Sequence, residues 1–185
     1  MQYHKMLSAH IPSAGIYGDC WRTAIACILD LHPSEVPHWM QLYPNPEGGD
    51  NSTPHPERDA AFESFLRSKG FSHVYVCYNL GDSSLQELWD EISRVQGKDL
   101  VYLVTANSPT GPHVVINCGN RMLWDPSPTN RGVVKSIDGY VWVMHLIPAF
   151  MRGNFTPPQE TIDPTSFAVQ EMLEGSISED EAEGV

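Results

Sequence analysis

One cysteine in this sequence stands where a helix is expected to begin. Cys20 follows Gly18 and Asp19, and the residues after it place apolar side chains at helical spacing: Trp21, Ala24, Ile25, Ile28 and Leu29. The free amides of a first helical turn and the positive end of the helix dipole favour a thiolate over a thiol. The pattern therefore predicts Cys20 as a nucleophile, with Asp19 capping the helix.

The same residues have a second interpretation. Free cysteines are among the most buried residue types, and many of them act only as small apolar side chains. A carboxylate beside a thiol also disfavours a second negative charge, so Asp19 works against a thiolate at Cys20. The chemistry of Cys20 therefore depends on partners elsewhere in the chain.

A histidine and an aspartate mark two neighbouring strands. His113 enters the apolar run 113–118, and Asp125 follows the run 121–124, with Gly119-Asn120 between them. A two-residue turn would place Asp125 opposite Val114 and leave His113 on the other face. A three-residue connection at 118–120 would place Asp125 opposite His113, and it matches apolar residues with apolar residues better. We therefore predict the second register and a contact between His113 and Asp125.

Such a pair would complete a nucleophilic site with Cys20. A carboxylate on one imidazole nitrogen fixes the tautomer and the orientation of the ring, and the other nitrogen can take a proton from a thiol and return it to a leaving group. The predicted roles are nucleophile for Cys20, base and then acid for His113, and orienting carboxylate for Asp125.

The elements that must position these residues can be predicted from periodicity and turn residues. We expect helices over about 20–31, 57–69 and 84–96, and a short helical turn that starts at 34–36 and ends near 39–40. We expect strands over about 72–78, 99–105, 113–118, 121–124 and 139–147. Residues 44–56 are rich in Pro, Gly and Asn and predict a loop. Helices followed by strands that are mostly adjacent predict an α+β domain, with the helix of Cys20 packed on an antiparallel sheet.

Charge is unevenly distributed along the 185 residues. The net charge is −12, but the chain after Arg152 holds eight acids and neither Lys nor Arg. We expect one domain over 1–150, an extended segment over 151–173 and a disordered acidic tail over 174–185. No basic face is evident, which argues against nucleic acid as a partner.

Other classes of site and location are disfavoured. The four cysteines form no C-x-x-C pair and the histidines show no ligand spacing, so we expect neither a metal nor a cofactor. The first residues lack the apolar run of a signal peptide, and no run is long enough to span a membrane. We expect a cytoplasmic protein with reduced thiols and no membrane partner.

Two parts of the chain resemble the papain-like and C39-like cysteine peptidases, most of all their short phage- or bacterium-encoded members. Gly18-Asp19-Cys20-Trp21 resembles the Cys-Trp at the head of their central helix, and Leu29-Asp30-Leu31 and the segment 36–39 follow as in those proteins. The order Cys, His and Asp and the segment 111–128 also match. The matching residues cover under a quarter of the chain and fix no substrate.

The resemblance implies a papain-like fold and thiol chemistry on an amide, isopeptide or thioester bond of a protein or peptide substrate. The chain would then be a hydrolase or an acyl transferase. The alternative is a catalytically weak or inactive phage accessory or anti-defence protein that binds a host protein or small ligand in the host cytoplasm.

One departure from the family favours that alternative. Papain-like enzymes usually place a Gln a few residues before the nucleophile, where it donates to the oxyanion, but residues 13–17 here are Ser-Ala-Gly-Ile-Tyr. Candidates near the oxyanion or the cleft are Ser13, Asp19 and Trp21, with His10 and Gln2 as further donors and the Cys20 amide as one more. Losing one such donor typically costs about 100-fold or more in rate.

Overall fold

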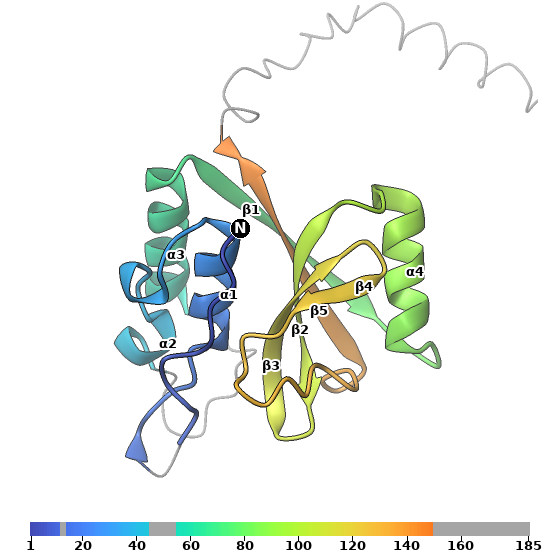
Figure 1. Cartoon of the computed structure of the whole chain (residues 1–185), viewed down its shortest axis with the longest axis horizontal. Helices are drawn as coiled ribbons and strands as arrows, with labels where there is room; N and C mark the ends of the chain where they lie inside the picture. Colours follow the sequence, from blue (N-terminus) through green and yellow to red (C-terminus); the bar gives the residue numbers. More distant parts are fainter. Residues whose placement is uncertain (12–13, 45–54, 150–185) are drawn as a thin grey trace, which may run out of the picture. The chain divides into compact units, whose positions relative to one another are not determined.

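A computed structural model describes residues 1–11, 14–44 and 55–149 (Figure 1). The chain separates into two units, Met1–Arg152 and Gly153–Val185, and every described residue belongs to the first. The expectations for 151–173 and 174–185, and most of the loop expected at 44–56, therefore lie outside the described residues.

The first unit contains helices and one antiparallel sheet. The helical elements are α1 (Cys20–Ile28), the 3-10 turn η2 (Pro33–Glu35), α2 (Trp39–Leu42), α3 (Pro56–Ser68) and α4 (Leu85–Gln96). The strands are β1 (Phe71–Asn79), β2 (Val101–Ser108), β3 (Gly111–Cys118), β4 (Arg121–Trp124) and β5 (Tyr140–Pro148), in the spatial order β1-β5-β2-β3-β4. The predicted α+β class with an antiparallel sheet is confirmed.

Local chemistry explains where the helices start and stop. The Ser84 hydroxyl accepts from the Glu87 amide at 3.2 Å, while the Glu87 carboxylate accepts from the Ser84 amide at 2.7 Å, which forms a capping box at the start of α4. Pro56 begins α3, where its missing N–H costs nothing. The first helix ends at Ile28, three residues before the predicted end, and Asp30 then adopts a left-handed conformation with φ of 57°.

Helices cover both faces of the sheet (Figure 1). On one face, α1 packs on β3 and α3 packs on β1, around a core that includes Ile25, Trp39 and Leu66. On the other face, α4 covers a second core that includes Trp89, Tyr102 and Val143. Because successive strand residues point to opposite faces, the two cores share the same three central strands.

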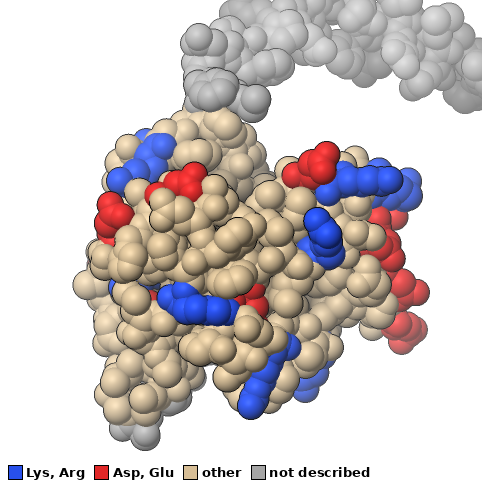
Figure 2. Space-filling model, viewed as in Figure 1, with Lys and Arg blue, Asp and Glu red and all other residues tan. Residues whose placement is uncertain are grey.

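Two further features bear on function. Among the described residues, no helix combines the length and the apolar character needed to cross a membrane. Figure 2 shows acidic side chains gathered over α4, at the right of the view, where Glu87, Asp90 and Glu91 are exposed, while the middle of the same face is mostly uncharged.

Candidate functional site

The packing of α1 on β3 determines where Cys20 lies. Cys20 is the first residue of α1 and is half-buried. The backbone amide of Val114, the residue directly after His113, faces its sulfur and lowers the pKa of the thiol. The start of the helix therefore meets the start of β3, as the predicted site requires.

The electrostatics of this thiol differ from the sequence-based expectation. Burial is the largest effect and raises the pKa of Cys20 to about 11, and the charge of Asp19 adds to this increase. The backbone amides of Val114, Trp21 and Cys20 lower the pKa but do not offset burial. The expected lowered pKa is therefore wrong for the resting thiol, although the first-turn amides act in the predicted direction.

His113 and Asp125 form the predicted contact. The His113 Nε2 lies 2.7 Å from the Asp125 Oδ1, and both side chains are buried. A carboxylate can only accept, so Nε2 carries the proton and Nδ1 is the nitrogen left for another partner. Within the described residues, Nδ1 makes no hydrogen bond.

The route to this contact differs from the predicted one. Cys118 pairs with Arg121 and Asn117 with Met122, so the turn at Gly119-Asn120 has two residues and the predicted register is wrong. The next pair is Ile116 with Trp124, which leaves Leu123 as an extra residue in a β-bulge. A one-residue shift moves side chains to the other face of a sheet. The bulge therefore returns Asp125 to the face of His113.

Asp125 is held by the turn that follows β4. Its Oδ1 also accepts from the Ser127 amide at 2.7 Å, and its Oδ2 accepts from the Gly132 amide at 2.8 Å. Burial alone would raise the pKa of Asp125, but the hydrogen bonds from His113, Gly132 and Ser127 outweigh it, so the net pKa is lowered. Asp125 is therefore a carboxylate at neutral pH.

The structure places the sulfur of Cys20 near the backbone beside His113 and joins His113 to Asp125 by a hydrogen bond. In the part of the chain that the structure describes, no hydrogen bond connects Cys20 to His113. The arrangement is a half-buried thiol beside the amide of Val114, with the preceding residue, His113, oriented by Asp125. Such a thiol can ionise near neutral pH only if another group takes its proton.

Asp19 does not cap the helix through its side chain. It precedes Cys20, but its buried carboxylate accepts instead from the amides of Leu7 at 3.2 Å and Ser8 at 3.0 Å, and it pairs with Arg22. Asp19 therefore attaches the N-terminal segment to the start of α1. An ionised carboxylate has no proton to donate to an oxyanion.

The other two oxyanion or cleft candidates are Ser13 and Trp21. Ser13 lies outside the described residues. The Trp21 ring packs against Trp39 and Phe62, with centroids 5.3 Å and 4.7 Å away, and its buried Nε1 has no partner among the described residues. The backbone amide of Cys20 is a further donor at the sulfur, because first-turn amides have no partner within the helix.

The remaining named donors take part in other contacts or show none. The His10 Nδ1 accepts from the Gly18 amide at 3.2 Å. Gln2 is exposed, and no described hydrogen bond involves it.

Sequence reasoning missed the residues that hold the segment before Cys20. The His38 Nε2 lies 3.0 Å from the Tyr17 carbonyl, and the Gln41 side chain bonds to the Tyr17 amide at 3.2 Å and to the Gly15 carbonyl at 3.3 Å. The neighbouring Trp39 is a core residue. These contacts join segments more than 20 residues apart, and no periodicity reports them.

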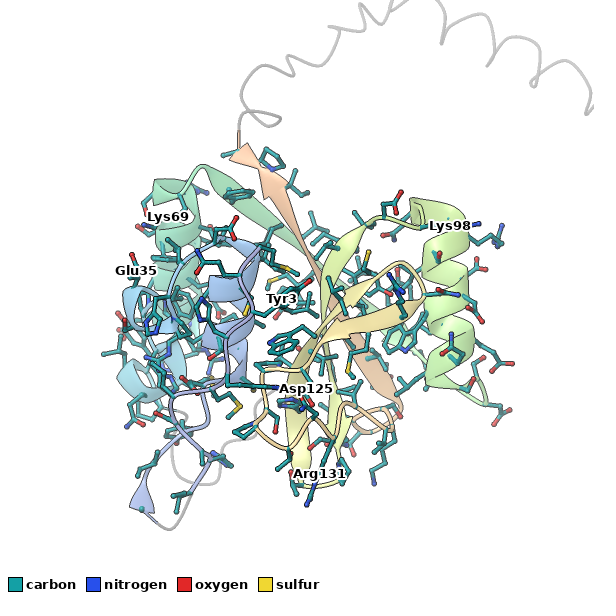
Figure 3. The ribbon with its side chains drawn as sticks, in the orientation of Figure 1. Tyr3, Glu35, Lys69, Lys98, Asp125 and Arg131 are labelled. Carbon is teal, nitrogen blue, oxygen red and sulfur yellow. The ribbon has the colours of Figure 1, made fainter. Side chains whose placement is uncertain are left out.

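Lys5 was also missed. Its ammonium bonds to the turn that carries Asp125, and it lies over the Trp124 ring, 4.2 Å from the centroid. Tyr3 packs against the same ring, with centroids 5.0 Å apart and the two rings tilted by 48°. Figure 3 labels Tyr3 and Asp125, and both lie between α1 and the strands in this view.

No group of three or more potential metal ligands is found in residues 1–11, 14–44 and 55–149. Comparisons of the chain with protein-family models, with curated proteins and with solved structures find no match.

Proposed function

We propose that this chain is a papain-like thiol hydrolase or acyl transferase that acts on amide, isopeptide or thioester bonds of a protein or peptide substrate through Cys20, His113 and Asp125. One observation carries the proposal. The buried hydrogen bond between the His113 Nε2 and Asp125 turns the imidazole so that Nδ1 has no partner among the described residues, and the backbone amide of the next residue of β3 faces the sulfur of Cys20.

The chemistry follows from this arrangement. The proton of the Cys20 thiol passes to the His113 Nδ1, and the sulfur attacks the carbonyl carbon of the substrate. The C–N or C–S bond then breaks, and the leaving group takes the proton from His113. Water or an acceptor amine next attacks the acyl–sulfur bond, with His113 as the base, and the thiol is restored. Asp125 remains ionised and stabilises the imidazolium.

Backbone amides would stabilise the oxyanion. The amides of Cys20, Trp21 and Val114 already face the sulfur and lower its pKa. Donors that are fixed before the reaction stabilise a developing negative charge without reorganisation. This backbone set takes the place of the side-chain donor that the sequence lacks.

A second candidate function is supported by the thiol itself. A pKa of about 11 and the absence of a described bond from Cys20 to His113 are what an inert buried cysteine would show. In that case the chain is a papain-like accessory protein that binds a host protein or a small ligand through the same surface.

The pH dependence of alkylation separates the two functions. Iodoacetamide reacts with thiolates, and peptide mapping gives the rate at each cysteine, with the exposed Cys77 as an internal reference. If His113 takes the proton, Cys20 reacts near neutral pH, and His113→Ala slows it by about 100-fold or more at pH 7.5. In this variant no imidazole takes the proton, so the rate at Cys20 rises only at a pH high enough to ionise a thiol whose pKa burial raises.

Wild-type behaviour identical to that of His113→Ala would refute the proposal and support the binding protein. A further test uses p-nitrophenyl acetate as an acyl donor. Release of p-nitrophenolate together with acetylation mapped to Cys20, lost in Cys20→Ser and in His113→Ala, is expected of the enzyme.

A further inference from the structure

The side chain of Lys5 donates its hydrogen bonds to a single turn, residues 125–130. Its ammonium donates to the Asp125 carbonyl at 2.6 Å, to the Ser127 carbonyl at 2.8 Å and to the Asn130 side-chain oxygen. An ammonium group has three hydrogens, so each has an acceptor within residues 125–130. The turn therefore binds the Lys5 ammonium through all three of its hydrogens.

Lys5 holds the turn through its backbone. Both oxygens of the Asp125 carboxylate already accept, from His113 and the Ser127 amide on one oxygen and from the Gly132 amide on the other. Lys5 instead bonds to carbonyls on either side of Pro126. It therefore sets where the carboxylate lies without taking part in its hydrogen bonds.

Neighbours of Lys5 reinforce this attachment. The Trp124 Nε1 donates to the His4 carbonyl at 2.9 Å, and the Met6 amide donates to the Pro126 carbonyl at 2.9 Å. With Lys5, these bonds fasten three successive residues of the N-terminal segment to the end of β4 and the turn after it.

The same segment is fastened at its other end to the residue before the nucleophile. Leu7 and Ser8 donate their amides to the Asp19 carboxylate, and the Asp19 amide donates to the Ser8 carbonyl at 3.4 Å. Residues 4–8 thus span from the turn of Asp125 to the start of α1. The segment therefore links the turn that carries Asp125 to the start of the helix that carries Cys20.

We propose that Lys5 is a positioning residue for the catalytic site: it fixes the 125–130 turn so that Asp125 holds the His113 imidazole with Nδ1 available to Cys20. This inference rests on the proposed function for its catalytic part. When Lys5 loses its ammonium, two backbone carbonyls lose their charged donor and the turn relaxes. A shift of about 1 Å in such a group can cost about 100-fold in rate.

The test uses the full chain with Lys5→Met, which keeps the length and apolar stem of the side chain. Lys98→Met is the matched control, because Lys98 is exposed and lies beside α4, far from Asp125 in Figure 3. Asn130→Gly removes one of the three acceptors and tolerates the positive φ of 50° at this position. Circular dichroism verifies that each variant is folded.

Two readouts are measured. The first is the rate of Cys20 alkylation by iodoacetamide at pH 7.5. The second is water exchange of the His113 Nε2 proton, followed by NMR with ¹⁵N-labelled histidine. A general loss of stability would accelerate the exchange of many protons, whereas a displaced Asp125 carboxylate accelerates the exchange of the His113 Nε2 proton in particular.

In Lys5→Met we expect alkylation about 10-fold or more slower and exchange of the Nε2 proton about 10-fold or more faster. Asn130→Gly should change both readouts in the same direction by less, and Lys98→Met should match wild type. If Lys5→Met does not fold, Asn130→Gly carries the test.

The inference is overturned if the His113 Nε2 proton exchanges at the wild-type rate in every folded variant at residues 5 and 130. Exchange that accelerates in Lys5→Met, in a chain whose alkylation is slow and independent of His113, would support the positioning role of Lys5. The same result would refute the thiol chemistry, so the two failures are distinguishable.

Discussion

Replacing Asp125 by Asn tests the central feature of the site, because the two side chains have nearly the same shape. The amide oxygen of Asn can still accept from His113 and from the Ser127 amide. The amide nitrogen then replaces the oxygen that accepts from Gly132 at 2.8 Å, so two donors face each other in a buried place.

The magnitude follows from these contacts. Hydrogen bonds to a charged group contribute about 1.5–3 kcal/mol each, and a buried donor left unpaired costs about 1–3 kcal/mol. One bond is lost and two others lose the charge of their acceptor. We therefore expect Asp125→Asn to lower the free energy of unfolding by about 2–4 kcal/mol at pH 7.

The difference should depend on pH in a definite direction. The folded-state pKa of Asp125 is lowered, so its ionised form stabilises the fold fully above the unfolded-state pKa of about 4. This contribution is lost as the pH falls through the lowered folded-state pKa. The gap between wild type and Asp125→Asn should therefore shrink as the pH falls below about 4.

Urea unfolding followed by circular dichroism measures both effects. Asp138→Asn makes the same chemical change at an exposed position with a positive φ, and it should shift stability by no more than about 0.5 kcal/mol. A loss below about 1 kcal/mol for Asp125→Asn, or a gap that does not change in acid, would refute the described hydrogen-bond set.

Three further changes test how the fold positions the site. Gly119→Ala should lower the free energy of unfolding by at least about 2 kcal/mol, because the added Cβ would lie 2.3 Å from the Lys98 carbonyl oxygen. Gly81→Ala should cost less, since Gly81 also has a positive φ but has open space around it, and thermal melts compare the two variants. Asp19→Asn should cost about 2–4 kcal/mol in urea unfolding, since the charge of Arg22 loses its partner; wild-type stability would contradict this. Ser84→Ala should cost about 1 kcal/mol through loss of the capping box, measured against Ser83→Ala.

Elements were predictable from the sequence because their signals are local. The capping box at Ser84 and the alternation along the strands each depend on residues a few positions apart, and the predicted helices and strands all occur. Helix α1 ends early because the left-handed Asp30 stops it, a conformation that apolar spacing does not report.

The site was harder to predict because its geometry depends on the length of the hairpin turn and on a bulge, and no local pattern specifies either. The hairpin has a two-residue turn together with a bulge at Leu123, whereas the two registers considered from the sequence differ in turn length alone. The contact between His113 and Asp125 occurs as predicted, but the predicted register that led to it does not occur. The bulge supplies the one-residue shift that the predicted loop would have supplied.

The thiol illustrates the same limit for electrostatics. The helix position of Cys20 predicted a lowered pKa, and the amides do act in that direction, but the depth of burial depends on packing against β3, which spacing does not reveal. Burial makes the histidine essential to the proposed chemistry. A thiol with a pKa of about 11 is un-ionised at neutral pH unless His113 takes its proton, so a position of Asp125 that misdirects the imidazole should abolish thiolate formation as completely as removing His113.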